Sequence, residues 1–435
     1  MAGVAPWRWV PTAYLAEGIP YAIATGLAAT LFKDLGYEDS QITHALASIS
    51  IMWSLKPLYA GFLEMFRSKR FWVITTEFGI SALLLAAAIC LLLPKPFWVV
   101  IGLLWLVAAA AATQDICVDG VYVTTLDGRE QAAWVGWAGA AWNSGKILAL
   151  AAIVLVASVL QRSMGLSPRV AWMAALSVAA LSMAALATYH AAHLPVASAP
   201  QRPGSASDVL RTFWIQWLDF FRKPQIWGML LFIGLYRSSE GFLLQEAPLF
   251  MQASVETGGL GLCATVELTA NCPHFLADKA RIDGVLSTVT GGLFGVLGGI
   301  YLARVGLCTR TMLIMAACLN VPHVTLIVLS QLAASGRPVG LATTAALITV
   351  EKAGYSFGFV ANMAYMMQQV APGRYYMTHY ALCTALMQLP LVPIQALSGP
   401  LAASLGYQTY FVVACLAALP SLIVAALAPF PVRQN

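Results

Sequence analysis

The stretch FWVVIGLLWLVAAAAATQDICVDGVY, residues 97–122, combines the two features that decide the fold. Residues 97–112 carry no charged side chain, and the whole stretch exceeds the roughly 20 residues that a membrane-spanning helix needs. Asp115 and Asp119 then follow one helical turn apart, so they share a face of that helix. The apolar run is continuous rather than alternating, which excludes a strand of a membrane β-barrel. The stretch predicts a transmembrane helix with two acids inside the membrane.

The composition of the whole chain agrees with this local pattern. Of its 435 residues 60% are hydrophobic and 10% are charged, and the mean hydropathy is +0.75. A soluble domain carries about 25% charged residues. The net charge of +5 does not indicate a nucleic-acid partner, because the basic residues lie in short loops. The chain is therefore expected to be an all-α membrane protein.

Further apolar runs of similar length predict twelve transmembrane helices in total. Backbone groups in lipid must be satisfied within each segment, which favours a helix for every run. The predicted spans are residues 9–32, 40–63, 71–93, 97–122, 133–158, 169–191, 224–248, 281–303, 310–332, 339–366, 376–398 and 406–428.

A change of composition divides these spans into two groups of six. Residues 195–207, PVASAPQRPGSAS, are typical of a flexible linker. The residues after it have apolar positions at helical spacing, which predicts a helix on the membrane surface, or a simple tether. We expect an N-terminal half at 1–193, a cytoplasmic linker with an interfacial helix at 194–223, and a C-terminal half at 224–435.

The loops also predict the orientation. More Lys and Arg residues lie in the loops on the side of the two termini than in the loops on the opposite side. Because positively charged loops stay in the cytoplasm, both termini are expected there. Six spans, a linker and six further spans form the layout of a major facilitator transporter, in which the substrate site lies between the halves near the membrane midplane.

Charged residues predicted to lie inside the membrane are candidates for function, because they are costly there and usually face a cavity or a partner. They fall on the predicted spans that line the central cavity in the major facilitator layout: Glu17, Lys56, Asp115, Asp119, Lys146, Arg237, Glu240, Glu246, Glu351 and Lys352. A count of these charges leaves one surplus carboxylate in each half. We predict proton-coupling roles for Asp115 and Glu351 first, and also for Asp119 and Glu17. The alternative is that the charges form ion pairs that only hold the helices together.

Asp115 and Asp119 repel each other unless a cation or a proton lies between them, and Lys56 or Lys146 could supply that cation. Arg237 and Lys146 are predicted to bind an anionic group, and a substrate could displace Glu240 from Arg237. The remaining predicted substrate residues offer amide or aromatic groups, although each could equally be a packing residue: Gln114, Asn143, Tyr236, Tyr355 and Asn362.

The chain shows no pattern typical of an enzyme. It lacks the phosphate-binding GxxxxGK[ST] motif, and its eight cysteines form no CxxC pair, so we expect no metal site and no cofactor. Cys263 and Cys272 both fall in the longest loop on the outer side, about 250–280. An oxidising compartment would favour a disulfide between them, with two free thiols as the alternative.

Several stretches resemble the AmpG permease group of the major facilitator superfamily, which also contains acetyl-coenzyme A transporters and siderophore importers of the RhtX and FptX type. The resemblance rests on LAEGIPYAIATG (15–26), SLKPLYAGFLE (54–64), ATQDICVDG (112–120), YRSSEGFLLQEAPLFM (236–251) and VEKAGYSFGFVANMAYM (350–366). Gln114, Asp115 and Asp119 match the helix-4 motif of the group, and Lys56 matches its helix-2 lysine. In the loop after the second span, GFLEMFRSKR departs from the usual signature by having Glu64 in place of Asp.

The resemblance implies a permease of the bacterial inner membrane that imports anhydromuropeptides with protons. We therefore expect a monomeric proton-coupled importer of an amino-sugar or anhydromuropeptide-like solute in contact with membrane lipid. The alternatives are a permease for a siderophore, acetyl-coenzyme A or a drug-like solute, and a membrane sensor that binds its solute without moving it.

Overall fold

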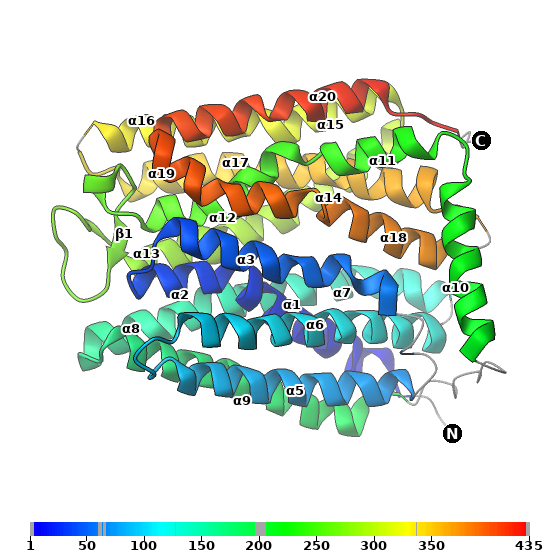
Figure 1. Ribbon diagram of the computed structural model, residues 1–435, viewed down its shortest axis with the longest axis horizontal. Coiled ribbons are helices and arrows are strands. Elements are labelled where there is room, and N and C mark those ends of the chain that lie inside the picture. Colours follow the sequence, from blue (N-terminus) through cyan, green and yellow to red (C-terminus); the bar gives the residue numbers. More distant parts are fainter. Residues whose placement is uncertain are drawn as a thin grey trace.

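The computed structural model describes residues 4–59, 63, 67–126, 128–195, 206–335, 337–373 and 375–431. Within these ranges the chain is almost entirely helical (Figure 1). Eight stretches are long and apolar enough to cross a membrane, and one of them, Thr378–Leu427, holds two predicted spans. The three other predicted spans correspond to α3 (Asp39–Ser54), to α11 with α12, and to α17 (Leu341–Tyr365).

The helices of the N-terminal half follow the predicted spans closely. Three of the spans are long uninterrupted helices, and two contain a π-helical segment between α-helices. The elements are η1 (Pro6–Arg8), α1 (Val10–Ala22), η2 (Ile23–Leu27), α2 (Ala28–Asp34), α3, α5 (Lys69–Cys90), α6 (Phe97–Thr125), α7 (Gly128–Ile147), η3 (Leu148–Ile153), α8 (Val154–Met164) and α9 (Pro168–His193).

The C-terminal half begins after α10 and contains more interruptions. Its elements are α10 (Ala206–Phe221), α11 (Ile226–Leu235), α12 (Ser238–Gln252), η4 (Val255–Thr257), β1 (Leu262–Ala264), β2 (His274–Phe275), α13 (Leu276–Lys279), η5 (Ala280–Leu286), α14 (Ser287–Val305), α15 (Thr309–Asn320), η6 (Val321–His323), α16 (Val324–Ala334), α17, η7 (Met366–Val370), α18 (Tyr376–Gln388), α19 (Leu391–Leu416) and α20 (Ala418–Leu427).

Two of these interruptions have clear local causes. The predicted span 224–248 is not one helix, because the backbone leaves the helical region at Arg237 (φ −107°, ψ 22°) and separates α11 from α12. Gly406 (φ 72°, ψ 154°) interrupts α19 and separates the last two spans. A positive φ is readily adopted only by glycine.

Each half packs around its own apolar core. One core draws mainly on α1 to α9, with Trp172 and Phe32 fully buried in it. The C-terminal half has two, one around Phe232 and Tyr365 and one around Phe250 and Phe411. The linker predicted at 194–223 lies partly outside the described residues, as do Glu64 and most of the loop around it. The helix of the predicted linker is α10, which lies across one end of the bundle (Figure 1).

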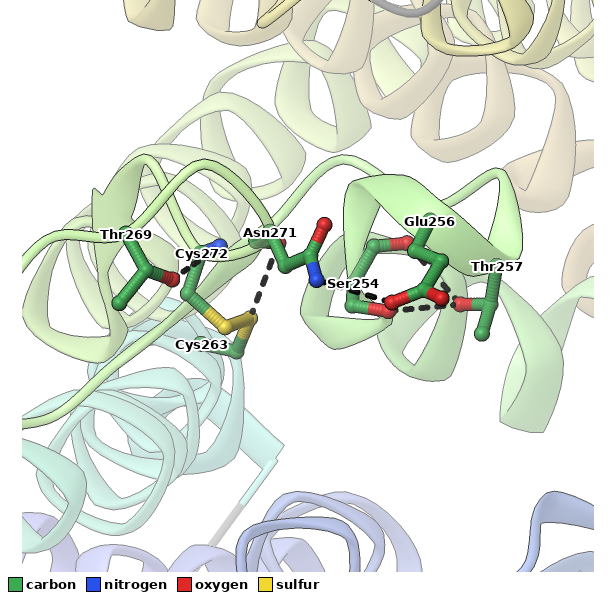
Figure 2. Close-up of a disulfide and its surroundings, with 7 residues drawn as sticks. All are labelled: Ser254, Glu256, Thr257, Cys263, Thr269, Asn271 and Cys272. Atoms are coloured by element: carbon green, nitrogen blue, oxygen red, sulfur yellow. Dashed lines mark hydrogen bonds between the residues drawn. A yellow bond between two sulfur atoms is a disulfide. The ribbon is translucent and has the colours of Figure 1, made fainter.

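We call the end of the bundle at α10 the linker end, and the opposite end, at β1, the β-loop end (Figure 1). At the β-loop end the two strands form a short parallel pair, with Leu262 opposite His274. The structure joins Cys263 to Cys272 in a disulfide, and the Cys272 N–H donates to Thr269 Oγ1 at 3.0 Å (Figure 2). The loop contacts both halves, since His274 Nε2 lies 2.7 Å from Val339 O and the Arg162 guanidinium stacks on Phe275.

The halves are joined at the β-loop end by a set of contacts that we call the seal. Thr30 on α2 accepts from Gln252 Nε2 through its carbonyl (3.2 Å) and from Lys279 Nζ through its hydroxyl (2.9 Å). Thr43 Oγ1 on α3 accepts from the Gly399 N–H at 3.2 Å. Tyr407 OH on α19 donates to Asp39 Oδ2 at 2.9 Å. These contacts join α2 and α3 of the N-terminal half to α12, α13 and α19 of the C-terminal half.

Glycines allow the closest helix crossing within the N-terminal half. A Cβ atom on Gly18 of α1 would lie 2.2 Å from Trp142 O, and one on Gly145 of α7 would lie 2.3 Å from Leu15 O. In the C-terminal half, Gly354 and Gly358 of α17 likewise approach Pro322 and the backbone of α15.

We expect Gly145→Ala to destabilise the protein by about 1–3 kcal/mol, because the added methyl group overlaps α1 backbone atoms. The measurement is thermal unfolding of the purified protein in detergent. Gly139→Ala on the same helix is the matched control, since no atom lies within 4 Å of a Cβ placed there. Equal melting temperatures for the two variants would contradict the prediction.

Candidate functional site

A cavity of about 380 Å³ lies within the N-terminal half, toward the linker end. Three acids border it: Glu17 from α1, and Asp115 and Asp119 from α6. The remainder of its lining comes from the same helices and from α7: Tyr14, Tyr122, Ala138, Gly139, Trp142 and Asn143. Four predicted site residues, Glu17, Asp115, Asp119 and Asn143, therefore border one cavity, but that cavity lies within the N-terminal half and not between the halves as predicted.

The three acids differ in their partners. Asp115 forms an ion pair with Lys56 Nζ of the neighbouring span, so Lys56 supplies the cation. Asp119 Oδ1 accepts a hydrogen bond from Tyr14 OH at 2.8 Å. Glu17 is only 5% exposed, and no described residue donates to its Oε1. Among the described residues, no Lys or Arg lies within ion-pair distance of Glu17 or Asp119, and both acids border the cavity.

Lys146 does not lie between the two aspartates, which corrects one of the two predicted arrangements. Its ammonium group stands over the Trp142 ring at 4.8 Å, and Trp142 in turn packs against Tyr21 at 5.4 Å. No described carboxylate lies within 4.0 Å of Lys146 Nζ, and its electrostatic neighbours are Lys352, Asp283 and Glu240 of the other half. Lys146 therefore faces the C-terminal half as an unpaired cation.

The helix break at Arg237 positions the main polar group of the C-terminal half. Arg237 directs its Nε and Nη2 toward the two oxygens of Glu240, one helical turn further on. Tyr355 OH on α17 donates to Glu240 Oε1 at 2.7 Å, and the Arg237 guanidinium lies 4.9 Å from the Phe359 ring centroid. Arg237 Nη1 has no hydrogen-bond partner among the described residues. This donor is free for a further acceptor.

Tyr21 on α1 lies near charged groups of both halves, namely Asp115 on one side and Arg237 and Glu240 on the other. The cavity itself draws only on α1, α6 and α7, so the convergence of charges from both halves on one cavity stays a prediction. The predicted site residues differ from prediction in several positions.

Glu351 is not the surplus carboxylate of the C-terminal half. It lies 3.0 Å from Lys352 Nζ and 3.3 Å from His323 Nδ1, with 3% of its surface exposed. Among the described residues of this half, the buried carboxylate with no hydrogen-bond partner on either oxygen is Glu246 on α12.

Gln114 lies behind the cavity rather than in it. It is fully buried, and its Nε2 donates to Glu77 Oε1 at 3.0 Å. Glu77 also accepts from His190 Nδ1 at 2.8 Å, and His190 Nε2 lies 2.9 Å from Thr12 Oγ1. This buried cluster ties α1, α5, α6 and α9 together. The sequence signal for this cluster is Glu77, an acid inside a predicted transmembrane span that was not among the predicted site residues.

Tyr236 and Asn362, both predicted to bind substrate, also lie in the protein interior. Tyr236 is fully buried beside Phe232, and its hydroxyl donates to Gly358 O at 3.0 Å. Asn362 is fully buried, and neither atom of its amide has a partner among the described residues. Tyr355 is the predicted aromatic residue that does reach the polar group of this half.

We expect Glu77→Ala to destabilise the protein by about 1–3 kcal/mol for each buried donor left without an acceptor, which are those of Gln114 and His190. Glu38→Ala, at an exposed glutamate, is the control. Its free energy of unfolding should lie within about 0.5 kcal/mol of the wild-type value. Chemical unfolding in detergent measures both. Unchanged stability of Glu77→Ala would show that the cluster does not hold the helices.

Comparisons with known proteins support the fold. No family model matches the chain, and no curated protein matches it. Among solved structures, the nucleoside transporter NupG is similar with a TM-score of 0.68 at 15% identity, covering 97% of this chain and 99% of its own. The peptide transporter PepTSo2 gives 0.65 at 13% identity, covering 96% of each chain.

A structure described as giving insight into substrate recognition in proton dependent oligopeptide transporters is also similar. It has a TM-score of 0.66 at 14% identity and covers 95% of this chain and 97% of its own. These matches extend over nearly the whole chain. The protein therefore has the major facilitator fold, with twelve transmembrane helices in two six-helix halves.

Proposed function

We propose that this protein is a proton-coupled secondary transporter that imports an amino-sugar or anhydromuropeptide-like solute across the bacterial inner membrane. The observation that carries the proposal is the cavity bordered by Glu17, Asp115 and Asp119, whose lining residue Trp142 packs against the Lys146 ammonium group. A bundle sealed at one end and polar at its centre suits alternating access. The similar structures named above are transporters, which supports this class.

The proposed orientation determines which side of the membrane each end of the bundle faces. With both termini in the cytoplasm, as the Lys and Arg distribution predicts, the linker end faces the cytoplasm and the β-loop end faces the periplasm. The cavity is then on the cytoplasmic side, and the seal separates it from the periplasm. The disulfide of the β-loop would lie on the oxidising side, as a stable disulfide requires.

Glu17 and Asp119 are the proposed proton sites. A bare carboxylate in a low-dielectric surrounding is costly, and a bound proton removes that cost. Both acids border the cavity and neither has a cation, whereas Asp115 is neutralised by Lys56. Asp115 and Glu351 can join the proton pathway only if their ion pairs open. Binding of a proton and solute must favour one facing over the other, because equal affinity for both would drive nothing.

The solute class rests on the available binding groups and on the resemblance to the AmpG group. Lys146 offers a cation for a carboxylate, Arg237 offers a free Nη1, and Asn143 offers an amide at the cavity wall. Trp142 and Tyr355 present rings for a sugar. A siderophore or drug-like solute would suit the same groups. Acetyl-coenzyme A is less favoured, because few basic groups face the centre. A sensor that binds without transport remains the alternative of a different class.

Proton coupling predicts how variants behave in proteoliposomes. A pH difference of one unit supplies about 1.36 kcal/mol per proton, which can concentrate a solute about tenfold. We expect Glu17→Gln and Asp119→Asn to lose this accumulation of labelled anhydromuropeptide while still exchanging it between the two sides. Glu38→Gln should accumulate it normally. Asp115→Asn and Glu351→Gln test the two paired acids. Full gradient-driven accumulation in all four variants would contradict the proposed coupling.

Solute class can be tested without transport. At 100 times its Kd a ligand stabilises the folded protein by about 2.7 kcal/mol. We expect anhydromuropeptides to raise the melting temperature more than free amino sugars, siderophores or acetyl-coenzyme A. Lys146→Gln should reduce that shift, and Lys95→Gln, at an exposed loop lysine, should not. A shift produced only by a siderophore would replace the proposed solute.

A further inference from the structure

The seal contains a carboxylate that the proposed transport site does not use. Glu246 on α12 is fully buried, and no described residue donates a hydrogen bond to either of its oxygens. The adjacent Gln245 is also fully buried, and its amide likewise has no partner among the described residues. Buried polar groups in proteins are nearly always hydrogen-bonded, so an isolated carboxylate needs an explanation.

The charged groups around Glu246 are already committed to other partners. Lys33 on α2 pairs with Asp39 on α3, and Asp39 also accepts from Tyr407. On α19, Tyr410 OH donates to Phe242 O. On α13, Lys279 binds Thr30 and the side chain of Asp283. The titratable and charged groups on the elements that pack against α12 at this end are Lys33 and Asp34 on α2, Asp39 and His44 on α3, Asp278 and Lys279 on α13, and Tyr407 and Tyr410 on α19. Asp34 accepts from Gln161 and Trp172, Asp278 accepts from Arg281 and from the Phe275 N–H, and His44 Nδ1 lies 2.7 Å from Ser40 O.

An ionised Glu246 would therefore have no counter-charge of its own. The nearest acid, Asp39, would repel it, and Lys33 is shared with that acid. Placing such a charge in a dry interior is far more costly than keeping the carboxyl group neutral. A neutral carboxyl group needs no counter-charge, which agrees with the described surroundings of Glu246.

Glu246 also lies where the two halves meet. Its helix packs against α2, α3 and α19, and the Tyr407–Asp39 and Gly399–Thr43 hydrogen bonds join α3 to α19. If the seal opens, α3 separates from α19 and water reaches this region. A hydrated carboxylate no longer carries the desolvation cost and can release its proton.

We propose that Glu246 is a proton-binding site of the seal, occupied while the β-loop end is closed and emptied when that end opens. The inference rests on the proposed function in one respect, namely that the seal opens during alternating access. The closed form then binds one proton more than the open form. Linkage requires that raising the pH shifts the equilibrium toward the open form, by at most tenfold per pH unit.

The first test measures opening of the seal by hydrogen–deuterium exchange in lipid nanodiscs, without solute or gradient. The reporter peptides cover residues 28–43 and 394–410, and the rates are corrected for the intrinsic effect of pH. We expect exchange in the wild type to rise from mildly acidic to mildly alkaline pH. In Glu246→Gln, which cannot ionise, exchange should stay low at every pH. Glu246→Asp should keep the pH dependence.

The matched control is Glu256→Gln. Glu256 also lies at the β-loop end, and its side chain accepts a hydrogen bond from Asn271 (Figure 2). This variant should show the wild-type pH dependence. If Glu246→Gln also shows that dependence, the inference is wrong. Because this experiment needs no transport, loss of proton coupling in proteoliposomes with an intact Glu246-dependent response would overturn only the proposed function. Normal coupling with a pH response independent of Glu246 would overturn only this inference.

Infrared spectroscopy provides a second measurement that does not depend on opening of the seal. The difference between wild-type and Glu246→Gln spectra at neutral pH should contain the carbonyl band of one protonated carboxyl group. A difference spectrum with carboxylate bands instead would show that Glu246 is ionised in the closed form and would overturn the inference.

Discussion

The cost of a charged side chain in a low-dielectric interior is the constraint on which this structure depends. Every membrane-embedded charge must find a partner, a water-filled space or a proton. The protein uses all three solutions. Lys56 neutralises Asp115, and Arg237 neutralises Glu240. Glu17 and Asp119 border a cavity instead. Glu246 has no hydrogen-bond partner among the described residues and does not line the described cavity, so we propose that it carries a proton.

The same constraint explains how much could be predicted from the sequence. Long apolar runs are unambiguous, so the spans, the two halves and the helices that carry charges followed from the residues alone. The break at Arg237 was not predicted, because Tyr236 and Arg237 have no Pro or Gly beside them to mark it.

Side-chain direction was the part that could not be read from residue types. Gln114 and Asp115 are neighbours in the sequence, but consecutive residues point about 100° apart on a helix. One therefore faces the cavity, and the other faces the cluster around Glu77. Glu351 was counted as a free acid although Lys352 follows it directly. Only the arrangement of η6 and α17 shows that His323 also lies beside Glu351.

The two types of contact between helices have different consequences for movement. Within the N-terminal half, Gly18 and Gly145 bring the backbones of α1 and α7 into direct contact. We expect these two helices to move together, because even one added methyl group would overlap the facing backbone. The seal is different, because its hydrogen bonds join side chains such as Tyr407 and Asp39 that can exchange partners for water. Rigid halves with a hydratable seam are the combination that alternating access needs. The protonation state of a single buried acid at that seam can then bias the equilibrium between closed and open forms.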